Sequence, residues 1–577
     1  MSSGGGMLGG VTIEPSVPAR MRDGTILRAD VYRPEAPGSY PVLLQRSPYG
    51  KTWAQGIVFQ HPAWYARRGY VVVVQDARGR FDSEGEFEPY RNEAQDGADT
   101  IRWAAGLPGA NGRVSTFGFS YAGAQQLLAA AEQPAELRCC APGFTGSDFY
   151  DGWTYVGGAL SQAFVISWVV STLAPGDALK RGDSAAAEAL LRAAPAIPSL
   201  YWTQPLRDFP LLKEHAVAPY FFEWLAHDTR DAYWRDLSIA ERHDRIDTPC
   251  LHYGGWYDSF IEGTLANFTA LAERAGGDPA RAQRLVVGPW AHMPWSRTCG
   301  VRNFGENADN AIDEAQLRWF DYWLKDEGNA LDEPPVRLFV MGENRWREAD
   351  RWPPADVRVE EWYLRSSGRA LSLSGDGALS REGPGDEPPD VFVYIPGLPV
   401  PSLGGRSCCS ADVAPIGPVD QTPVEVRNDV LVYSTPPLER DVEVTGTVLL
   451  VLHAATDAAD TDWTAKLVDV DEAGCAINLS DGIVRARFRE SLERPLPIER
   501  ARVYEYRIRV GSTSNLFRRG HRIRLEVSSS NFPAYDVNLN TGQRVGEGTL
   551  LDGLPATQAV YHDGTRPSRL VLPVARR

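Results

Sequence analysis

Apolar strand-like runs that alternate with helical segments dominate the first third of this chain. Residues 41–44, 70–75 and 114–119 are almost continuously apolar, and helix-period segments at 56–68 and 93–105 separate them. Strands that are apolar on both faces are typical of a parallel sheet that helices cover on both sides. The pattern therefore predicts an α/β fold, with a hairpin at Asp23-Gly24 before these strands and another strand at 138–141 after them.

The residue composition and the pattern of apolar residues then change twice along the chain. Residues 146–244 lack β-branched runs and are rich in Trp, Tyr, Phe and Ala, which predicts a helical insertion. Strand patterns return at 249–253 and 284–287, and an amphipathic helix follows at 312–324. After residue 350, short alternating strands succeed one another without helices, as in an antiparallel sandwich of the jelly-roll kind. We expect an α/β core (1–145 and 245–350), a helical cap (146–244) and a jelly-roll-like all-β domain (351–577).

The charge balance limits the classes of partner. The chain has 59 Lys and Arg against 75 Asp and Glu, a formal net charge of −16. Nucleic acids and anionic membranes reward a basic surface, so neither is expected as a partner. The longest apolar runs are far shorter than the ~18 residues that a membrane span needs.

The cysteines and the N-terminal residues indicate a compartment. The seven cysteines are odd in number and show no C-x-x-C spacing, which suits reduced thiols better than a disulfide framework or a zinc site. Residues 1–7 lack the basic and apolar regions of a secretory signal. We expect a cytoplasmic protein without a bound metal or cofactor.

The most informative motif is Gly118-Phe-Ser120-Tyr-Ala-Gly123, which joins the apolar run at 114–119 to a helical segment. A strand that turns sharply into a helix at Gly-x-Ser is the context of a nucleophile elbow, in which small neighbours let the chain reverse. Ala122 stands where the common motif has glycine, and it is still small. Ser120 is therefore the candidate nucleophile, and the alternative is an ordinary turn serine.

A second Gly-x-Ser match occurs at Gly182-Asp-Ser184. No strand precedes it, and an alanine-rich helix follows. We interpret Ser184 as a helix N-cap.

A serine nucleophile needs a base and an acid that orients the base. His292 follows the predicted strand at 284–287, and Asp258 follows the one at 249–253. Ligands of open α/β sheets bind at the carboxyl ends of the strands, and the chain order Ser, Asp, His is that of α/β-hydrolases. We therefore predict a catalytic triad of Ser120, Asp258 and His292. The alternatives are a structural loop histidine and a capping aspartate.

Acyl transfer also needs donors for the oxyanion. The backbone N–H of Tyr121, directly after the nucleophile, is the expected first donor. The loop after the strand at 41–44 reads Arg46-Ser-Pro-Tyr49-Gly-Lys51 and has no glycine run for a second backbone donor. The phenol of Tyr49 is a candidate in its place, and a packing role for this tyrosine is equally compatible with the sequence.

These segments together carry a family resemblance. Gln75-Asp-Ala-Arg-Gly-Arg-Phe, the Ser120 elbow, Gly254-Gly-Trp-Tyr-Asp258 and Gly288-Pro-Trp-Ala-His292 resemble the cocaine esterase family of hydrolases. The resemblance continues through Pro399-Val-Pro-Ser-Leu-Gly-Gly405 and Leu479-Ser-Asp-Gly-Ile-Val-Arg485 to Ser529-Ser-Asn-Phe-Pro533, so it covers nearly the whole chain. α-Amino-acid ester hydrolases, glutaryl cephalosporin acylases and X-Pro dipeptidyl-peptidases are included in this family.

The resemblance implies several further features. It implies an α/β-hydrolase core, a helical cap and a C-terminal jelly roll, it makes Tyr49 the second oxyanion donor, and it suggests a homodimer. It also implies that cap aromatics line the acyl pocket. Phe260 stands where α-amino-acid ester hydrolases carry an acidic residue, which favours an uncharged acyl group. The candidate substrate-binding residues are Trp153, Phe164, Trp168 and Phe260; the alternative is that the cap residues only fill a core.

The predicted function is hydrolysis of small-molecule carboxylic esters through an acyl-enzyme on Ser120, with amides as a further substrate class. One alternative is an X-Pro dipeptidyl-peptidase or an acylase of the β-lactam or glutaryl type. Another is a binding protein that uses its jelly roll and no longer catalyses. The set of Ser120, Asp258 and His292 argues against this last alternative.

Overall fold

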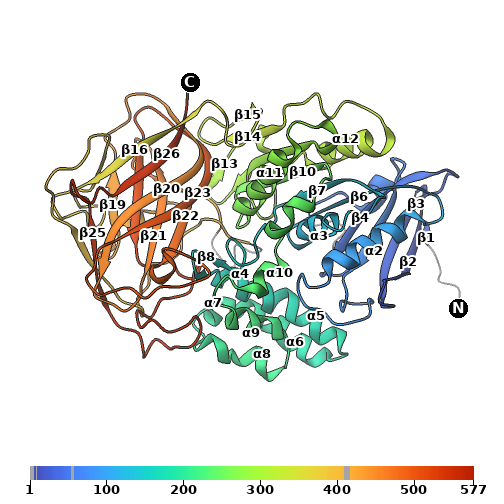
Figure 1. The fold of residues 1–577 in the computed structure, drawn as a ribbon, viewed down its shortest axis with the longest axis horizontal. Coiled ribbons are helices and arrows are strands. Elements are labelled where there is room, and N and C mark those ends of the chain that lie inside the picture. Colours follow the sequence, from blue (N-terminus) through green and yellow to red (C-terminus); the bar gives the residue numbers. More distant parts are fainter. Residues whose placement is uncertain (1–5, 8, 53–57, 409–415, 577) are drawn as a thin grey trace.

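The computed structural model describes residues 6–7, 9–52, 58–408 and 416–576. Its first part is built on an eleven-stranded sheet with the order β1-β2-β3-β5-β4-β6-β7-β10-β11-β14-β15 (Figure 1). The strands are β1 (Gly6–Met7), β2 (Val11–Arg20), β3 (Ile26–Pro34), β4 (Tyr40–Ser47), β5 (Val71–Asp76), β6 (Ala110–Phe119), β7 (Leu137–Gly143), β10 (Cys250–Tyr257), β11 (Gln283–Ala291), β14 (Val336–Val340) and β15 (Arg345–Ala349).

The sheet is mixed: the predicted apolar strands pair parallel at its centre, and antiparallel strands flank them on both sides. The strands from β5 to β14 in this order pair parallel, whereas β1, β2 and β3 at one end and β15 at the other pair antiparallel. Short turns join β2 to β3 and β14 to β15, and two strands joined by a tight turn must run antiparallel. β3 also pairs antiparallel with β5, although the two are far apart in the chain. The turn between β2 and β3 is the predicted one at Asp23-Gly24, where Gly24 has φ of 91°.

Helices cover both faces of the sheet, as the apolar strands predict. In β5 every residue is buried. Val71 and Val73 pack in the same core as helices α2 (Glu93–Ala105), α3 (Tyr121–Ala130) and α11 (Ile261–Ala275). Val72 and Val74 pack on the other face against α1 (Pro62–Ala66) and α12 (Ile312–Lys325). Successive side chains of a strand point to opposite faces, so one apolar strand joins both cores.

Helices fill the segment between β7 and β10, where the sequence predicts an insertion. They are α4 (Gln162–Trp168), a π-helical turn (Val169–Leu173), α5 (Ala174–Lys180), α6 (Ser184–Ala193), α7 (Ile197–Leu200), α8 (Pro210–Glu214), α9 (Pro219–Ala226) and α10 (Ala232–Leu237). A small hairpin, β8 (Tyr155–Val156) and β9 (Ala159–Leu160), precedes them. The N-cap of α6 is Asp183, which accepts a hydrogen bond from the Ala186 N–H, so the prediction of Ser184 as the cap was wrong by one residue.

The rest of the chain forms a second, all-β sheet system (Figure 1). Its strands are β16 (Val357–Arg365), β17 (Ala378–Ser380), β18 (Asp390–Tyr394), β19 (Leu431–Ser434), β20 (Val442–Thr456), β21 (Asp462–Val470), β22 (Ala476–Arg485), β23 (Tyr504–Phe517), β24 (Arg522–Ser528), β25 (Ala556–Tyr561) and β26 (Arg569–Ala575). The predicted fold class, an α/β core followed by an all-β domain, is confirmed. The boundaries at residues 145, 244 and 350 stay predictions.

The state of the cysteines and the length of the apolar helices can be compared with the expectations from the sequence. Cys139, Cys140, Cys250, Cys299 and Cys475 are free, whereas Cys408 takes part in a disulfide, so the expectation of reduced thiols fails at that position. No helix within the described part of the chain is long and apolar enough to cross a bilayer.

Candidate active site

Ser120 lies on a strained turn between β6 and α3. Its φ of 60° and ψ of −127° are unusual for a residue with a side chain, and its N–H donates to the Gly143 carbonyl at 2.9 Å. A Cβ placed on Gly118 would lie 2.8 Å from the Cβ of Ala122, and one on Gly123 would lie 2.7 Å from the Gly143 oxygen. Small residues are therefore required around Ser120, as in a nucleophile elbow.

Asp258 and His292 lie side by side at the ends of neighbouring parallel strands. Asp258 directly follows β10 and His292 directly follows β11, and their predecessors Tyr257 and Ala291 are register partners. A bulge in β11 after Gly288 brings these residues into line. The Nδ1 atom of His292 lies 2.7 Å from Oδ1 of Asp258, and both side chains are almost fully buried.

Aromatic rings surround the imidazole of His292 and place it beside the elbow. The ring of Phe119, which precedes Ser120, has its centroid 5.5 Å away, and that of Phe144 is 6.1 Å away. The indole N–H of Trp295 donates to the His292 carbonyl at 2.8 Å and so holds the loop. The sequence analysis did not single out Phe144 or Trp295, although Trp295 stands only three residues after His292.

Tyr121 begins α3, so its backbone N–H has no acceptor within the helix. The side chain of Tyr121 is buried, and its hydroxyl donates to Glu93 at 2.9 Å. The same carboxylate accepts from Arg46 at 2.6 Å and from Gln125 at 2.7 Å. This buried network fixes the first turn of α3 on the core, and it was missed by the sequence analysis because its members are scattered over 80 residues.

Tyr49 lies beside Ser120, the candidate nucleophile. The indole N–H of Trp168 donates to its hydroxyl at 3.2 Å. Burial raises the pKa of Tyr49 to about 12, although its contacts with Trp168 and Ser120 and the charge of Arg80 act in the opposite direction. The phenol therefore keeps its proton at neutral pH and can donate a hydrogen bond.

The four predicted substrate-binding aromatics form one buried cluster that reaches His292. Trp153 stacks on Phe260 with centroids 3.9 Å apart, and Phe164 stacks on Trp168 at 5.3 Å. Phe164 also meets Phe260 edge-on at 5.1 Å. The ring of Phe260 in turn contacts that of His292 at 5.1 Å. The cap and the core thus meet in an apolar region beside the predicted catalytic histidine.

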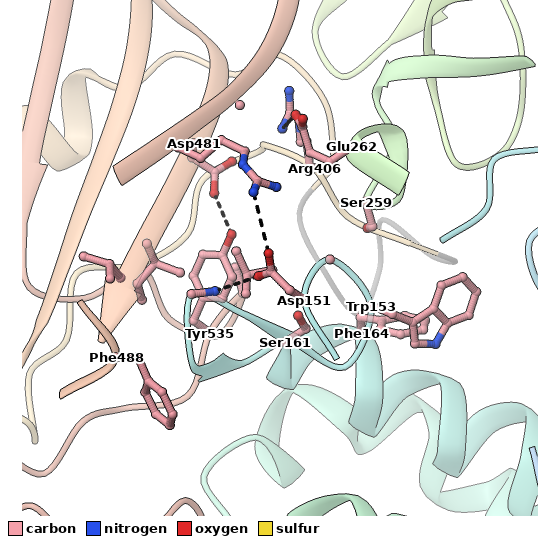
Figure 2. A pocket seen from close by; sticks show the side chains of 18 of the residues that line it. Asp151, Trp153, Ser161, Phe164, Ser259, Glu262, Arg406, Asp481, Phe488 and Tyr535 are labelled. Atoms are coloured by element: carbon pink, nitrogen blue, oxygen red, sulfur yellow. Dashed lines mark hydrogen bonds and ion pairs between the residues drawn. The ribbon is translucent and has the colours of Figure 1, made fainter. Parts of the chain in front are cut away.

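A cavity of about 330 Å³ adjoins this cluster, where the cap, the core and the all-β domain meet (Figure 2). Trp153, Phe164 and Ser259 line it on one side. Elsewhere its wall is charged, and it includes Glu262, which pairs with Arg406 at 3.0 Å. Sequence reasoning missed this cavity because its wall combines segments that are more than 300 residues apart.

Within the ranges that the structure describes, no three His, Cys, Asp or Glu side chains come together in a way that could hold a metal ion.

Comparisons with known proteins agree with this architecture. Residues 23–294 match the X-Pro dipeptidyl-peptidase (S15) family, and residues 329–571 match the X-Pro dipeptidyl-peptidase C-terminal non-catalytic domain. The chain is 39% identical to the cocaine esterase of Rhodococcus sp. (strain MB1 Bresler) over 582 residues, which cover 99% of this chain and 100% of that protein.

Solved structures are similar over the same length. An α-amino acid ester hydrolase with 25% identity has a TM-score of 0.84, and the match covers 98% of this chain and 97% of that one. An aminopeptidase from a marine sediment Thaumarchaeota archaeon, with 24% identity and a TM-score of 0.82 over 98% of this chain and 97% of that one, shares the fold. This chain therefore belongs to the cocaine esterase family of serine hydrolases, within the wider X-Pro dipeptidyl-peptidase (S15) family.

Proposed function

We propose that the chain hydrolyses carboxylic esters through an acyl-enzyme on Ser120. The observation that carries this proposal is the buried 2.7 Å contact between His292 Nδ1 and Asp258, beside a serine on a strained elbow. The names of relatives that match the full chain, an esterase and an ester hydrolase, support the same reaction class.

His292 acts as the general base in this proposal. When its Nδ1–H donates to Asp258, its Nε2 carries a lone pair that can take the proton of the Ser120 hydroxyl. The Ser120 oxygen then attacks the ester carbonyl carbon. Asp258 holds the imidazole in this tautomer and stabilises the imidazolium that forms. The imidazolium protonates the leaving alcohol as the C–O bond breaks.

Two donors stabilise the negative oxygen of the tetrahedral intermediate. The backbone N–H of Tyr121 at the start of α3 is one, and the helix N-terminus adds a favourable dipole. The phenol of Tyr49 is the other, and its contact with Ser120 supports this role. Water then attacks the acyl-enzyme, with His292 again as the base, and Ser120 is regenerated.

The acyl group lies against Trp153, Phe164, Trp168 and Phe260 in this proposal. These rings gain free energy by removing an aryl or alkyl group from water. The two residues that follow Ser259 are Phe260 and Ile261, and the carboxylate of the next residue, Glu262, is already paired with Arg406 at 3.0 Å. We therefore propose an uncharged acyl group, and small-molecule esters as the substrate class.

The proposal also covers the cellular compartment, the type of all-β domain and the oligomeric state. We place the protein in the cytoplasm, which the five free thiols support and the Cys408 disulfide does not; cell fractionation tests this. We interpret the all-β domain as a jelly roll. The homodimer that the family resemblance suggests stays a prediction, which analytical ultracentrifugation tests.

The direct test is turnover of a p-nitrophenyl ester by the wild type, Ser120→Ala and Ser184→Ala. We expect Ser120→Ala to lose nearly all activity and Ser184→Ala, an exposed residue at the start of α6, to keep it. Turnover that survives Ser120→Ala, or a wild type that binds esters without cleaving them, would contradict the proposal.

A further inference from the structure

Arg80 belongs to the Gln75–Phe81 segment that the family resemblance rests on, and the mechanism above leaves it without a role. Its side chain is completely buried. Its Nε donates to the Pro48 carbonyl at 2.8 Å, and its Nη1 donates to the Leu173 carbonyl at 3.1 Å and to Asp177 at 2.6 Å. Burying a guanidinium costs free energy unless the group is paired and hydrogen-bonded. These three contacts therefore stabilise the buried side chain of Arg80 in this position.

The partners of Arg80 connect the Tyr49 loop to the cap. Pro48 is the residue before Tyr49, on the loop that follows β4. Leu173 and Asp177 belong to the cap, in the π-helical turn and in α5. Arg80 therefore ties the carbonyl on the N-terminal side of Tyr49 to a cap helix.

The same stretch of the cap also binds the side-chain hydroxyl of Tyr49. Trp168 is the last residue of α4 and directly precedes the π-helical turn that ends at Leu173. Its indole N–H donates to the Tyr49 hydroxyl at 3.2 Å. The backbone beside Tyr49 and its phenol are thus both bound to residues 168–177 of the cap, the first through Arg80 and the second through Trp168.

The surroundings of Arg80 are shaped to its side chain. A Cβ on Gly176 would lie 1.9 Å from Arg80 Nη2, so only glycine leaves room for the guanidinium against α5. Its Cζ lies 4.6 Å from the ring centroid of Phe87. Asp177 in turn accepts from the Tyr220 hydroxyl at 2.9 Å, which fixes the carboxylate on the cap. A lysine could not make the three directed contacts of this planar group.

We propose that Arg80 is a positioning residue for the oxyanion hole, which acts through Tyr49 by fastening the Pro48–Tyr49 backbone to the cap. This inference rests on the proposed role of Tyr49 as the second oxyanion donor. The positive charge of Arg80 acts in the same sense, since it opposes the effect of burial on the Tyr49 pKa and makes the phenol a better donor.

A double-mutant cycle on kcat tests the proposal, with Tyr49→Phe, Arg80→Gln and the double variant assayed on one p-nitrophenyl ester. We expect Arg80→Gln alone to lower kcat about 10-fold at nearly constant KM, which is part of the ~10²–10³ that one oxyanion donor supplies. In the Tyr49→Phe background the same change should lower kcat less than about 2-fold, because the group through which Arg80 acts is gone.

Matched variants control for loss of structure. Arg78→Gln removes an arginine of the same segment that pairs with Asp23 and Asp96 and does not contact the cap; its kcat should stay within about 2-fold of the wild type. Gly176→Ala displaces the guanidinium without removing a charge and should lower kcat in the same direction as Arg80→Gln. If Arg80→Gln fails to fold, Gly176→Ala takes its place in the cycle, with Gly397→Ala, where an added Cβ meets nothing, as its control.

The outcomes separate the inference from the proposed function. A normal kcat for Tyr49→Phe contradicts the oxyanion role of Tyr49, and with it the role given to Arg80. A reduced kcat for Tyr49→Phe together with a normal kcat for Arg80→Gln and Gly176→Ala contradicts the Arg80 inference alone. So does a loss of kcat that is the same in both backgrounds.

Discussion

Trp153 of the cap and Phe260 of the core stack with their ring centroids 3.9 Å and their planes 15° apart. Phe260 comes two residues after Asp258, and its ring also meets that of His292 edge-on, with centroids 5.1 Å apart. The predicted acyl pocket and the predicted catalytic pair are therefore packed together. The ring of Phe260 lies in contact with both Trp153 of the cap and His292, the predicted general base.

The stacked pair predicts the choice of acyl group. An ammonium group among these four rings would lose water without gaining a carboxylate partner, at a cost of several kcal/mol. The p-nitrophenyl benzoate ester should have a higher kcat/KM than the matched phenylglycine ester or an Xaa-Pro anilide. Phe260→Ala should weaken this preference, whereas Phe268→Ala, an equally buried change on α11 away from Trp153, should not. A higher kcat/KM for the amino-bearing substrates would instead favour the dipeptidyl-peptidase alternative.

Removal of the Asp258 charge should disable the base without unfolding the protein. In Asp258→Asn the amide can hold His292 in the wrong tautomer, and kcat should fall by up to ~10⁴-fold. Asp313→Asn is the matched control, since Asp313 is also buried and accepts from the Tyr65 hydroxyl at 2.6 Å, outside the site. A near-normal kcat for Asp258→Asn would mean that another carboxylate orients the histidine.

Loss of the Tyr49 hydroxyl should affect the transition state more than substrate binding. Tyr49→Phe should lower kcat by ~10²–10³ and leave KM nearly unchanged, the usual effect of removing one oxyanion donor. The comparison is Tyr155→Phe, which removes a buried hydroxyl that donates to the Trp224 carbonyl at 2.9 Å in the cap. An unchanged kcat would assign Tyr49 to packing.

A buried histidine in the all-β domain should make stability depend on pH. His562 is fully buried, with Nε2 at 2.8 Å from Asp390 and Nδ1 at 3.3 Å from Glu387. Burial alone would lower the pKa of His562, but these two carboxylates outweigh it and raise the pKa above its usual value. A raised histidine pKa contributes stability that is complete below the unfolded-state value of about 6.5 and is lost as pH rises through the folded-state value.

The measurement is the difference in Tm between the wild type and His562→Gln. We expect this difference to be larger at pH 6 than at pH 9. His453→Gln serves as the control, because burial lowers the pKa of His453 and its contribution should change with pH in the opposite sense. A difference for His562→Gln that is constant with pH would mean that His562 does not carry a charge in the fold.

The parts of the fold that could be predicted are those that a few contiguous residues determine. The strand Val71–Asp76 could be predicted because it begins with four consecutive valines, and the Ser120 elbow because the strand, the small residues and the helix are contiguous. Asp258 and His292 were found for a related reason, since each follows a strand and parallel strands end at the same edge of the sheet.

The parts that could not be predicted depend on contacts between distant segments. Arg80 and Asp177 are 97 residues apart, and nothing in either segment indicates the other. The N-cap of α6 was misplaced because Asp183 and Ser184 are both good capping residues, and only the backbone decides between them. The assignment of Trp153 and Phe260 to one acyl site came from the family resemblance, since aromatics of a cap are equally suited to a core, and their stacking could not be predicted.

The proposed mechanism depends above all on Ser120 as the nucleophile, and covalent labelling identifies the nucleophile directly. The wild type is treated with a serine-reactive fluorophosphonate, digested, and analysed by mass spectrometry for the modified peptide. We expect a single adduct on Ser120, loss of activity in proportion to labelling, and no adduct in Ser120→Ala. An adduct on Ser184 or another serine, or full inactivation without modification of Ser120, would contradict the account.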